Sequence, residues 1–329
     1  MVALARTLPT IQAENPFAAD VLAGLQAPRK HLLAKYFYDA EGSRLFEEIT
    51  KLPEYYPTRT EMKLLRDYGS EIGKLIPEGA ALVEFGSGST KKARLLLKAA
   101  PKLAAYVPVD ICGEMIESEA AGLRRDRPQL PVLPVVADIC QPFALPDIAR
   151  NAPARVGFFP GSTIGNFEAH EAADFLRNAA KILGPDSTLI IGADLIKAPE
   201  ILNAAYNDKQ RVTAKFNKNL LVRINRELGA NFKLECFEHH AFYNRERSRV
   251  EMHLAAMKRQ KVRILGETID FRAGETIHTE NSYKYSVESL NALAGGVGWM
   301  PLKAWTDAKK YFVIAAFKLQ ARPKVTRSL

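Results

Sequence analysis

Residues 83–97, "VEFGSGSTKKARLLL", join a short apolar run to a glycine-rich turn and then to a helix-like segment. Gly86 and Gly88 allow the backbone to turn tightly and to approach a ligand, and the helix that follows offers free amide donors to an anion. The pattern differs from the G-x-G-x-x-G of dinucleotide-binding folds, because Lys91 stands at the third glycine position. The stretch therefore predicts a strand, a ligand-binding loop and a helix, and it weakens the case for a dinucleotide.

Further apolar runs repeat this arrangement along the first two thirds of the chain. Helix-like segments at 90–100 and 169–183 alternate with apolar runs at 80–85, 104–110, 131–139, 154–161 and 187–194. Continuous apolar strands separated by helices are typical of a parallel sheet that is covered on both faces. We therefore predict an α/β fold with a doubly wound sheet.

The pattern changes after Asp194. A long, charged helical region is expected from 196 to about 228, followed by strand-like segments, a helix and a terminal hairpin, at 232–243, 249–257, 261–271, 286–296 and 298–319. The simplest interpretation is a sheet domain that is interrupted by an insertion of about ninety residues, within the usual size of a half-domain lobe.

Residues 36–61, "YFYDAEGSRLFEEITKLPEYYPTRTE", precede the first glycine-rich loop. Aromatic residues, two prolines and scattered charges show no clean helical period there. We expect a turn-rich segment rather than a buried helix.

Composition limits the class of protein. The 329 residues are 47% hydrophobic and 25% charged, which predicts a globular chain with a large core. No run of about eighteen apolar residues and no secretory signal is found, so we expect a cytoplasmic protein without membrane contact. Cys112, Cys140 and Cys236 lie far apart without C-x-x-C spacing, so they are expected to be reduced bystanders. The net charge of +9 is spread along the chain, and we expect no nucleic-acid partner.

Acidic residues end the second and third apolar runs. Asp110 lies 26 residues beyond Glu84, close to where nucleotide-binding folds hold ribose hydroxyls. Asp138 suits an exocyclic amine such as that of adenine, with Ile139 beside the ring. Either aspartate alone could be a helix cap, but together they favour a nucleoside with an amino-acid tail, which is the shape of S-adenosylmethionine.

Lysines open the helix after the glycine loop. Lys91 and Lys92 stand in its first turn, where cations oppose the helix dipole, so an anion such as a carboxylate is expected to bind there. The alternative is that both lysines are solvated on a surface helix.

Seven stretches of the chain carry a family resemblance, over roughly residues 20–320. They are "KYFYDAEGSRLFEEITKLPEYYPTRTE", "LVEFGSGSTKKARLLL", "YVPVDI", "FFPGSTIGNF", "AYNDKQRVTAKFNKNLLVRINRELGANF", "RVEMHL" and "HTENSYKY". The chain resembles the histidine-specific S-adenosylmethionine-dependent methyltransferases, which make hercynine in ergothioneine biosynthesis. The "LPEYYPTRTE" segment is the most specific, since ordinary methyltransferases lack it.

The resemblance implies a Rossmann-like class I methyltransferase sheet with an inserted α+β substrate-binding lobe. The implied limits are 1–60 for the N-terminal part of that lobe, 61–195 for the methyltransferase core, 196–285 for the inserted lobe and 286–329 for the C-terminal part of the core. We expect a monomer that acts on a small amino acid.

The resemblance also implies site residues. Contacts to S-adenosylmethionine are expected from Tyr36, Gly86, Lys92, Asp110, Asp138 and Ile139. Contacts to L-histidine are expected from Tyr56, Asn166, Tyr206, Met252, Glu280 and Ser282, with Asn166 and Tyr56 as the catalytic pair. Without the resemblance, Asn166 would be taken as a turn asparagine bonding its own backbone, and Glu280 as a surface acid on a strand.

Methyl transfer from a sulfonium to a neutral amine is an in-line displacement that needs positioning and no metal. The histidines His31, His170, His239, His240 and His278 show no ligand spacing, so no metal site is predicted. His253 departs from the family, which tends to carry a bulky aromatic residue there, but strand alternation places it on the face opposite Met252. Two alternatives stay open: a methyltransferase for another amine, such as tryptophan or a prenylated derivative, and an RNA-directed or nonenzymatic binding protein.

Overall fold

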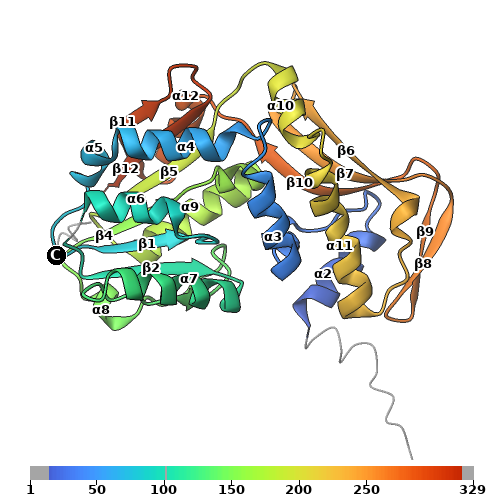
Figure 1. Cartoon of the computed structure of the whole chain (residues 1–329), viewed down its shortest axis with the longest axis horizontal. Coiled ribbons are helices and arrows are strands. Elements are labelled where there is room, and N and C mark those ends of the chain that lie inside the picture. The colour runs from blue at the N-terminus through green and yellow to red at the C-terminus, as the bar shows by residue number, and fades with distance from the viewer. Residues whose placement is uncertain (1–14, 101, 321–329) are drawn as a thin grey trace, which may run out of the picture. The chain divides into compact units, whose positions relative to one another are not determined.

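The computed structural model describes residues 15–100 and 102–320. The chain divides into two compact units, which are coloured by residue number in Figure 1. The core unit comprises Pro57–Lys197 and the chain from Tyr283 onward. The inserted unit comprises the chain up to Tyr56 together with Ala198–Ser282.

A seven-stranded sheet in the order β11-β12-β5-β4-β1-β2-β3 forms the centre of the core unit. Strands β1 to β5 pair in parallel, and β12 runs antiparallel to both β5 and β11. The strands are β1 Ala81–Phe85, β2 Ala105–Asp110, β3 Val135–Val136, β4 Arg155–Phe159, β5 Thr188–Asp194, β11 Trp299–Thr306 and β12 Phe312–Leu319. The predicted α/β fold with a mostly parallel sheet is confirmed.

Helices cover both faces of this sheet because its central strands are apolar on both sides. On β1, Leu82 packs in one buried cluster and its neighbour Val83 in the other. The Leu82 cluster draws on α4 Tyr56–Asp67, α5 Gly69–Gly73, α6 Lys91–Ala99 and α7 Gly113–Asp126. The Val83 cluster draws on α8 Asp147–Arg150, α9 Ala169–Leu183 and α12 Val287–Gly295. A short 3-10 helix, η2 Thr163–Asn166, follows β4.

The inserted unit mixes helices with a three-stranded sheet in the order β10-β7-β6 and a separate hairpin of β8 and β9. Its strands are β6 Phe237–Asn244, β7 Arg249–Ala256, β8 Gln260–Ile264, β9 Glu267–Phe271 and β10 Thr276–Tyr283. Its helices are α2 Pro16–Gln26, η1 Ala34–Phe37, α3 Ala40–Ile49, α10 Pro199–Tyr206, α11 Val212–Leu228 and η3 Leu234–Cys236.

The segment 36–61 is more helical than we expected, so the prediction of a turn-rich segment is wrong. Its central part forms α3, which begins where the Asp39 side chain accepts a hydrogen bond of 2.8 Å from the Gly42 backbone. Leu45 and Ile49, four residues apart, are buried, and Arg44 pairs with acids on the other side of the helix. The helical period is difficult to detect in the sequence because 36–61 contains the whole of α3, the turn after it and the first residues of α4.

Other predicted elements are shorter or divided. The run 131–139 yields only the two residues of β3, because prolines at 131 and 134 cannot donate to a ladder. The run 261–271 is a hairpin, in which Leu265 and Gly266 both have positive φ, 51° and 86°, as a two-residue hairpin turn requires. The helical region after 196 divides into α10 and α11. Asp208 lies between them and caps α11 by accepting from the Val212 and Thr213 amides, both at 2.8 Å.

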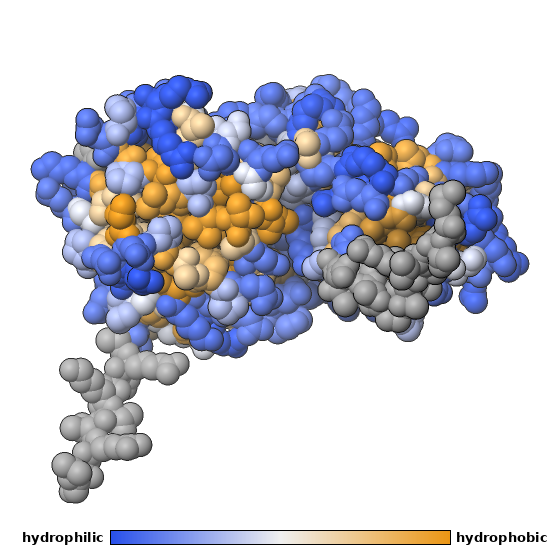
Figure 2. All heavy atoms as spheres, turned by 90° about the horizontal axis from the view of Figure 1, so that it is seen from below, coloured by the Kyte–Doolittle hydropathy of each residue, from blue (hydrophilic) through white to orange (hydrophobic). Residues whose placement is uncertain are grey.

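Figure 2 shows hydrophobic residues exposed on the side of the core unit where α7 and α8 lie in Figure 1. The edge strand β3 contributes Val136, which is 64% exposed. An edge of two residues offers few free backbone groups for pairing with another chain. All three cysteines are free thiols, as predicted. Within 15–100 and 102–320, none of the helices has the length and apolar character needed to cross a membrane.

A substitution at Gly157 can test how tightly the sheet packs against α9. A Cβ added there would lie 2.7 Å from the Cδ1 atoms of both Leu183 and Leu189. We expect Gly157→Ala to lower the free energy of unfolding by about 1–3 kcal/mol, measured by urea denaturation. The matched control is Gly295→Ala at the end of α12, where an added Cβ meets nothing within 4 Å. Equal stability of the two variants would show that the packing around Gly157 is loose.

Candidate active site

The strand order of the core sheet reverses between β1 and β4. Ligands of open parallel sheets bind outside the carboxyl ends of the strands at such a reversal. Asp110 is the last residue of β2, and Gly86, Asp138 and Asn166 come after β1, β3 and β4. The topology therefore brings four predicted site residues to one edge of one sheet.

The loop after β1 has the backbone geometry of a ligand cradle. Gly86 and Gly88 have φ of 69° and 29°, values that side-chain-bearing residues rarely adopt. A Cβ at Gly86 would lie 3.9 Å from Cδ1 of Ile139, whereas a Cβ at Gly88 would meet nothing within 4 Å. The loop thus presents bare backbone with open space beside it.

The two predicted nucleoside-binding acids are held by backbone amides. Asp110 accepts from the Gly88 amide at 3.1 Å and from the Cys112 amide at 3.0 Å. Asp138 accepts from the Cys140 amide at 2.9 Å. A carboxylate has about four lone-pair sites, so Asp110 keeps capacity for a diol after these two bonds. A fixed acid, an apolar Ile139 and a bare glycine loop fit a nucleoside ligand.

Lys92 has an internal anion that the sequence analysis missed. Its ammonium lies 2.6 Å from Oε2 of Glu61, whose side chain is only 1% exposed. Both carboxylate oxygens of Glu61 also accept from the Gly161 amide, at 2.9 and 3.0 Å. Lys92 thus has an anion within the fold, and its predicted contact with the cofactor stays a prediction. The only sequence signal for Glu61 was its place at the end of the "LPEYYPTRTE" motif.

Glu84, a buried residue of β1, is hydrogen-bonded to the glycine loop. It is 1% exposed, and it accepts hydrogen bonds from the Tyr106 hydroxyl and, at 3.0 Å, from Ser87 in the loop itself. Burial raises the pKa of Glu84 to about 8, although the hydrogen bonds from Tyr106 and Ser87 act in the opposite direction. Glu84 is therefore mostly protonated at neutral pH.

The turn that carries Asn166 is fixed by its neighbours. A Cβ at Gly165 would lie 2.8 Å from the backbone oxygen of Tyr283, so only glycine fits. The Tyr285 hydroxyl donates to the Ile164 carbonyl at 3.3 Å, and Ser162 Oγ accepts from the Asp194 amide at 2.9 Å.

No residue within 15–100 and 102–320 hydrogen-bonds the Asn166 side-chain amide. The alternative of a turn asparagine that bonds its own backbone therefore does not hold. Asn166 offers one acceptor and two donors to a ligand without adding charge.

The substrate-binding residues predicted for the inserted unit are all buried. Tyr206 on α10 donates to Ser282 Oγ on β10 at 2.7 Å, across 76 positions of sequence. The relative exposures of Tyr56, Tyr206, Met252, Glu280 and Ser282 are all below 9%. Glu280 is therefore not a surface acid, and that interpretation of the strand is wrong. Buried acids and hydroxyl groups require hydrogen-bond partners, so these residues suit a polar ligand better than an apolar one.

Tyr36, a predicted cofactor contact, is hydrogen-bonded within the inserted unit. It lies in the inserted unit, where its hydroxyl donates to Asp20 at 2.6 Å and its carbonyl accepts from Arg223 at 3.0 Å. These contacts give Tyr36 a structural role, and its predicted contact with the cofactor stays a prediction.

The Glu61–Lys92 pair should matter for stability. We expect Glu61→Gln to lower the free energy of unfolding by about 3 kcal/mol, because it leaves a mostly buried ammonium without its anion. Adding Lys92→Met should recover part of this loss, which a double-mutant cycle in urea would measure.

The matched control is Glu71→Gln, because Glu71 pairs with Lys303 and both side chains are about half exposed. Its loss should be much smaller. Similar losses for Glu61→Gln and Glu71→Gln would contradict the importance of the buried pair.

Glu84 should make stability depend on pH. Its pKa is about 8 in the folded chain and 4.5 in the unfolded chain, so the protonated form favours folding. This contribution is complete below about pH 4.5 and is lost as pH rises to about 8. Urea denaturation between about pH 5 and pH 8 should show the parent losing more stability than Glu84→Gln. Parallel pH profiles would mean that Glu84 is already ionised in the fold.

Known proteins are similar to this sequence over nearly its whole length. Residues 17–319 match the family described as "Histidine-specific methyltransferase, SAM-dependent". A histidine N-alpha-methyltransferase of Mycolicibacterium smegmatis is 41% identical over 313 residues, covering 93% of this chain and 96% of that protein. The histidine N-alpha-methyltransferase of Mycobacterium tuberculosis is 40% identical over 293 residues, covering 88% and 90%. Ergothioneine biosynthesis protein 1 of Neurospora crassa is 32% identical over 291 residues, covering 83% of this chain and 32% of that longer protein. The glycine loop and the strand-end acids are consistent with an S-adenosylmethionine site. Because the family model covers residues 17–319 and the relatives are up to 41% identical, the chain belongs to the histidine-specific S-adenosylmethionine-dependent methyltransferases.

Proposed function

We propose that the protein methylates the α-amino nitrogen of L-histidine, up to three times, and forms hercynine for ergothioneine biosynthesis. The observation that carries the proposal is the sequence identity to two histidine N-alpha-methyltransferases. They are 41% and 40% identical to this chain, over most of each protein. The buried polar side chains of Tyr206, Glu280 and Ser282 support it, because a histidine side chain has nitrogens that can hydrogen-bond to hydroxyl and carboxylate groups.

S-adenosylmethionine supplies an electrophilic methyl group on a sulfonium when it is bound. Gly86, Asp110, Asp138 and Ile139 are proposed to hold its nucleoside, since they line one edge of the sheet. Lys92 is proposed to bind its carboxylate, because an ammonium has three donors and the bond to Glu61 uses one of them. Tyr36 completes the proposed set.

The imidazole of histidine is proposed to bind Glu280 and Ser282, with Met252 packed against the ring. Glu280 is 8% exposed, and its carboxylate can accept a hydrogen bond from an imidazole N–H, which an aliphatic side chain cannot donate. This contact would favour histidine over aliphatic amino acids.

Asn166, Tyr56 and Tyr206 are proposed to hold the amino and carboxylate groups. The amine must be neutral and must lie about 3–3.5 Å from the methyl carbon. An α-amino group has a pKa of roughly 7.7–8.0 in peptides, so part of it arrives protonated and solvent water can accept each proton. Asn166 orients the amine hydrogens through its carbonyl oxygen and need not act as a base. Positioning therefore accounts for catalysis.

The expectations drawn from the sequence complete the proposal. They are a monomeric, cytoplasmic enzyme that binds a free amino acid, with domain limits at 1–60, 61–195, 196–285 and 286–329.

The decisive experiment incubates the purified protein with S-adenosylmethionine and, separately, each of the twenty amino acids and a prenylated tryptophan. Mass spectrometry should show histidine gaining one, two and three methyl groups. If histidine stays unmodified while tryptophan or another amine is methylated, the substrate is reassigned. An absence of S-adenosylmethionine binding by calorimetry would favour the alternative of a nonenzymatic binding protein.

The proposed imidazole contact makes a kinetic prediction. Glu280→Ala should raise KM for histidine by roughly tenfold or more and change kcat less, because it removes a contact that ground state and transition state share. Glu280→Gln keeps one acceptor and serves as the matched control with a smaller rise in KM. An unchanged KM in Glu280→Ala would rule out the contact.

A further inference from the structure

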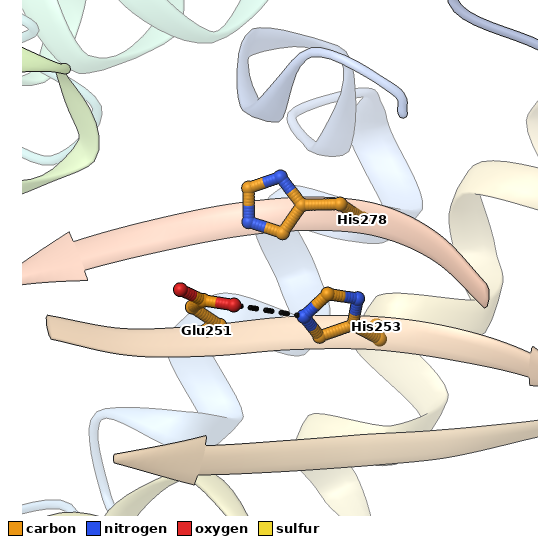
Figure 3. Close-up of side chains that lie close together, drawn as sticks. All are labelled: Glu251, His253 and His278. Atoms are coloured by element: carbon orange, nitrogen blue, oxygen red, sulfur yellow. Dashed lines mark hydrogen bonds and ion pairs between the residues drawn. The ribbon is translucent and has the colours of Figure 1, made fainter. Parts of the chain in front are cut away.

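Three side chains of types that bind metal ions lie close together in the inserted unit. None of them is among the proposed substrate and cofactor residues. They are Glu251 and His253 on β7 and His278 on β10, shown in Figure 3. One potential ligand atom of each lies within 4.8 Å of those of the other two. Oε2 of Glu251 is 3.2 Å from Nε2 of His253, and the centroids of the two imidazole rings are 4.9 Å apart.

The local fold explains this grouping. Alternate residues of a strand share a face, so Glu251 and His253 lie on the same side of β7 and Met252 on the opposite side. The neighbouring strand β10 brings His278 next to them, although it is 25 positions away from His253. The group therefore lies on the other face of β7 from the proposed substrate residue Met252.

Neighbouring side chains orient the carboxylate and one ring. Oε1 of Glu251 accepts from Arg249 Nε at 2.8 Å and from Asn244 Nδ2 at 3.1 Å, which directs Oε2 toward His253. Phe242 stacks on the His253 ring, with centroids 5.6 Å apart and planes at 10°. Partners of this kind, which fix the orientation of ligands, are typical of metal sites.

Two ring nitrogens in the group are buried and unsatisfied. Nδ1 of His253 and Nε2 of His278 have no hydrogen-bond partner among the residues that the structure describes. Buried polar atoms without a partner are rare in folded proteins, and an ion bound at Nε2 of His278 would give that atom a partner. In Figure 3 His278 lies on the strand next to the one that carries Glu251 and His253.

We propose that Glu251, His253 and His278 bind a divalent transition-metal ion, with Zn²⁺ as the preferred ion and water completing the coordination. Two imidazoles and one carboxylate suit zinc and its neighbours in the first transition row, whereas magnesium and calcium prefer all-oxygen sites. The site links β7 to β10.

The geometry needs only a modest adjustment. Ligand atoms about 2.0–2.1 Å from a tetrahedral zinc ion lie roughly 3.3 Å apart, close to the 3.2 Å between Glu251 and His253. The widest separation, at most 4.8 Å, must shorten by roughly 1.5 Å, which side-chain rotation can supply. Coordination replaces the Glu251–His253 hydrogen bond, and the proton of that ring then resides on Nδ1. The positive charge of Arg249 opposes the ion, so the affinity should be below that of thiolate zinc sites.

The test uses untagged, full-length protein that has been treated with chelator and then titrated with zinc chloride by calorimetry. One equivalent should bind, and zinc should raise the Tm. Cobalt(II) in place of zinc should give the visible absorption bands of a four-coordinate ion.

Two variants locate the ion. His253→Phe keeps the stack on Phe242, and His278→Gln keeps a polar side chain on β10; each should weaken zinc binding at least roughly tenfold and abolish the rise in Tm. The control is His170→Ala, because His170 is exposed on α9 of the core unit and should not matter. Thermal melting without zinc and S-adenosylmethionine binding check that each variant is folded.

The proposal fails if the parent binds no zinc, if folded His253→Phe and His278→Gln bind zinc as the parent does, or if His170→Ala loses binding equally. Metal binding is read out without methyltransferase activity. The outcome is therefore separate from that of the proposed histidine methylation.

Discussion

The buried carboxylate of Glu61 is the constraint on which the core unit depends. It comes from α4, yet it binds the ammonium of Lys92 in the first turn of α6 and the amide of Gly161 after β4. A buried acid is tolerated only when its charge is paired and its oxygens are hydrogen-bonded, and Glu61 meets both conditions. Gly192 of β5 has no side chain because a Cβ there would lie 2.1 Å from the Glu61 carboxylate. One side chain thus relates α4, α6, β4 and β5 at the ligand-binding edge of the sheet.

The rigid surroundings of this edge suit a reaction that depends on positioning. The glycine loop is held by Glu84 through Ser87 and by Asp110 through the Gly88 amide. The Asn166 turn is held by the close approach of Tyr283 to Gly165. A displacement at a methyl carbon requires little acid or base chemistry but needs the amine along one line. Preformed loops lower the entropy lost when that alignment is reached.

Strand alternation gives the two faces of β7 different chemistry. Met252 is buried on one face, next to β10 through the hydrogen bond of 3.0 Å from Thr279 to its carbonyl. Glu251 and His253 lie on the other face with His278. His253 therefore lies on the face of β7 opposite Met252 and belongs to a separate polar group. An imidazole stacked on Phe242 keeps the packing of an aromatic ring while adding ligand atoms.

The sequence by itself determined what local patterns encode. The apolar runs predicted the parallel strands, because a strand buried on both faces must be apolar at every position. Gly86, Asp110, Asp138 and Asn166 could be found at strand ends for the same reason. The helical character of 36–61 was missed, since the pattern of α3 was masked by the turn and the second helix that follow it.

Only the tertiary structure decided which distant residues meet. Lys92 and Glu61 are paired, Tyr206 bonds Ser282, and His278 joins Glu251 and His253, in each case across more than twenty positions. Glu280 is interpreted as a surface acid from its strand sequence, whereas in the folded chain it is buried. Sequence periodicity reports which face of an element is buried, but it carries no information on the partner that covers that face. Strand pairing and helix docking supply that partner, and so they alone determine the ion pairs and the candidate metal site.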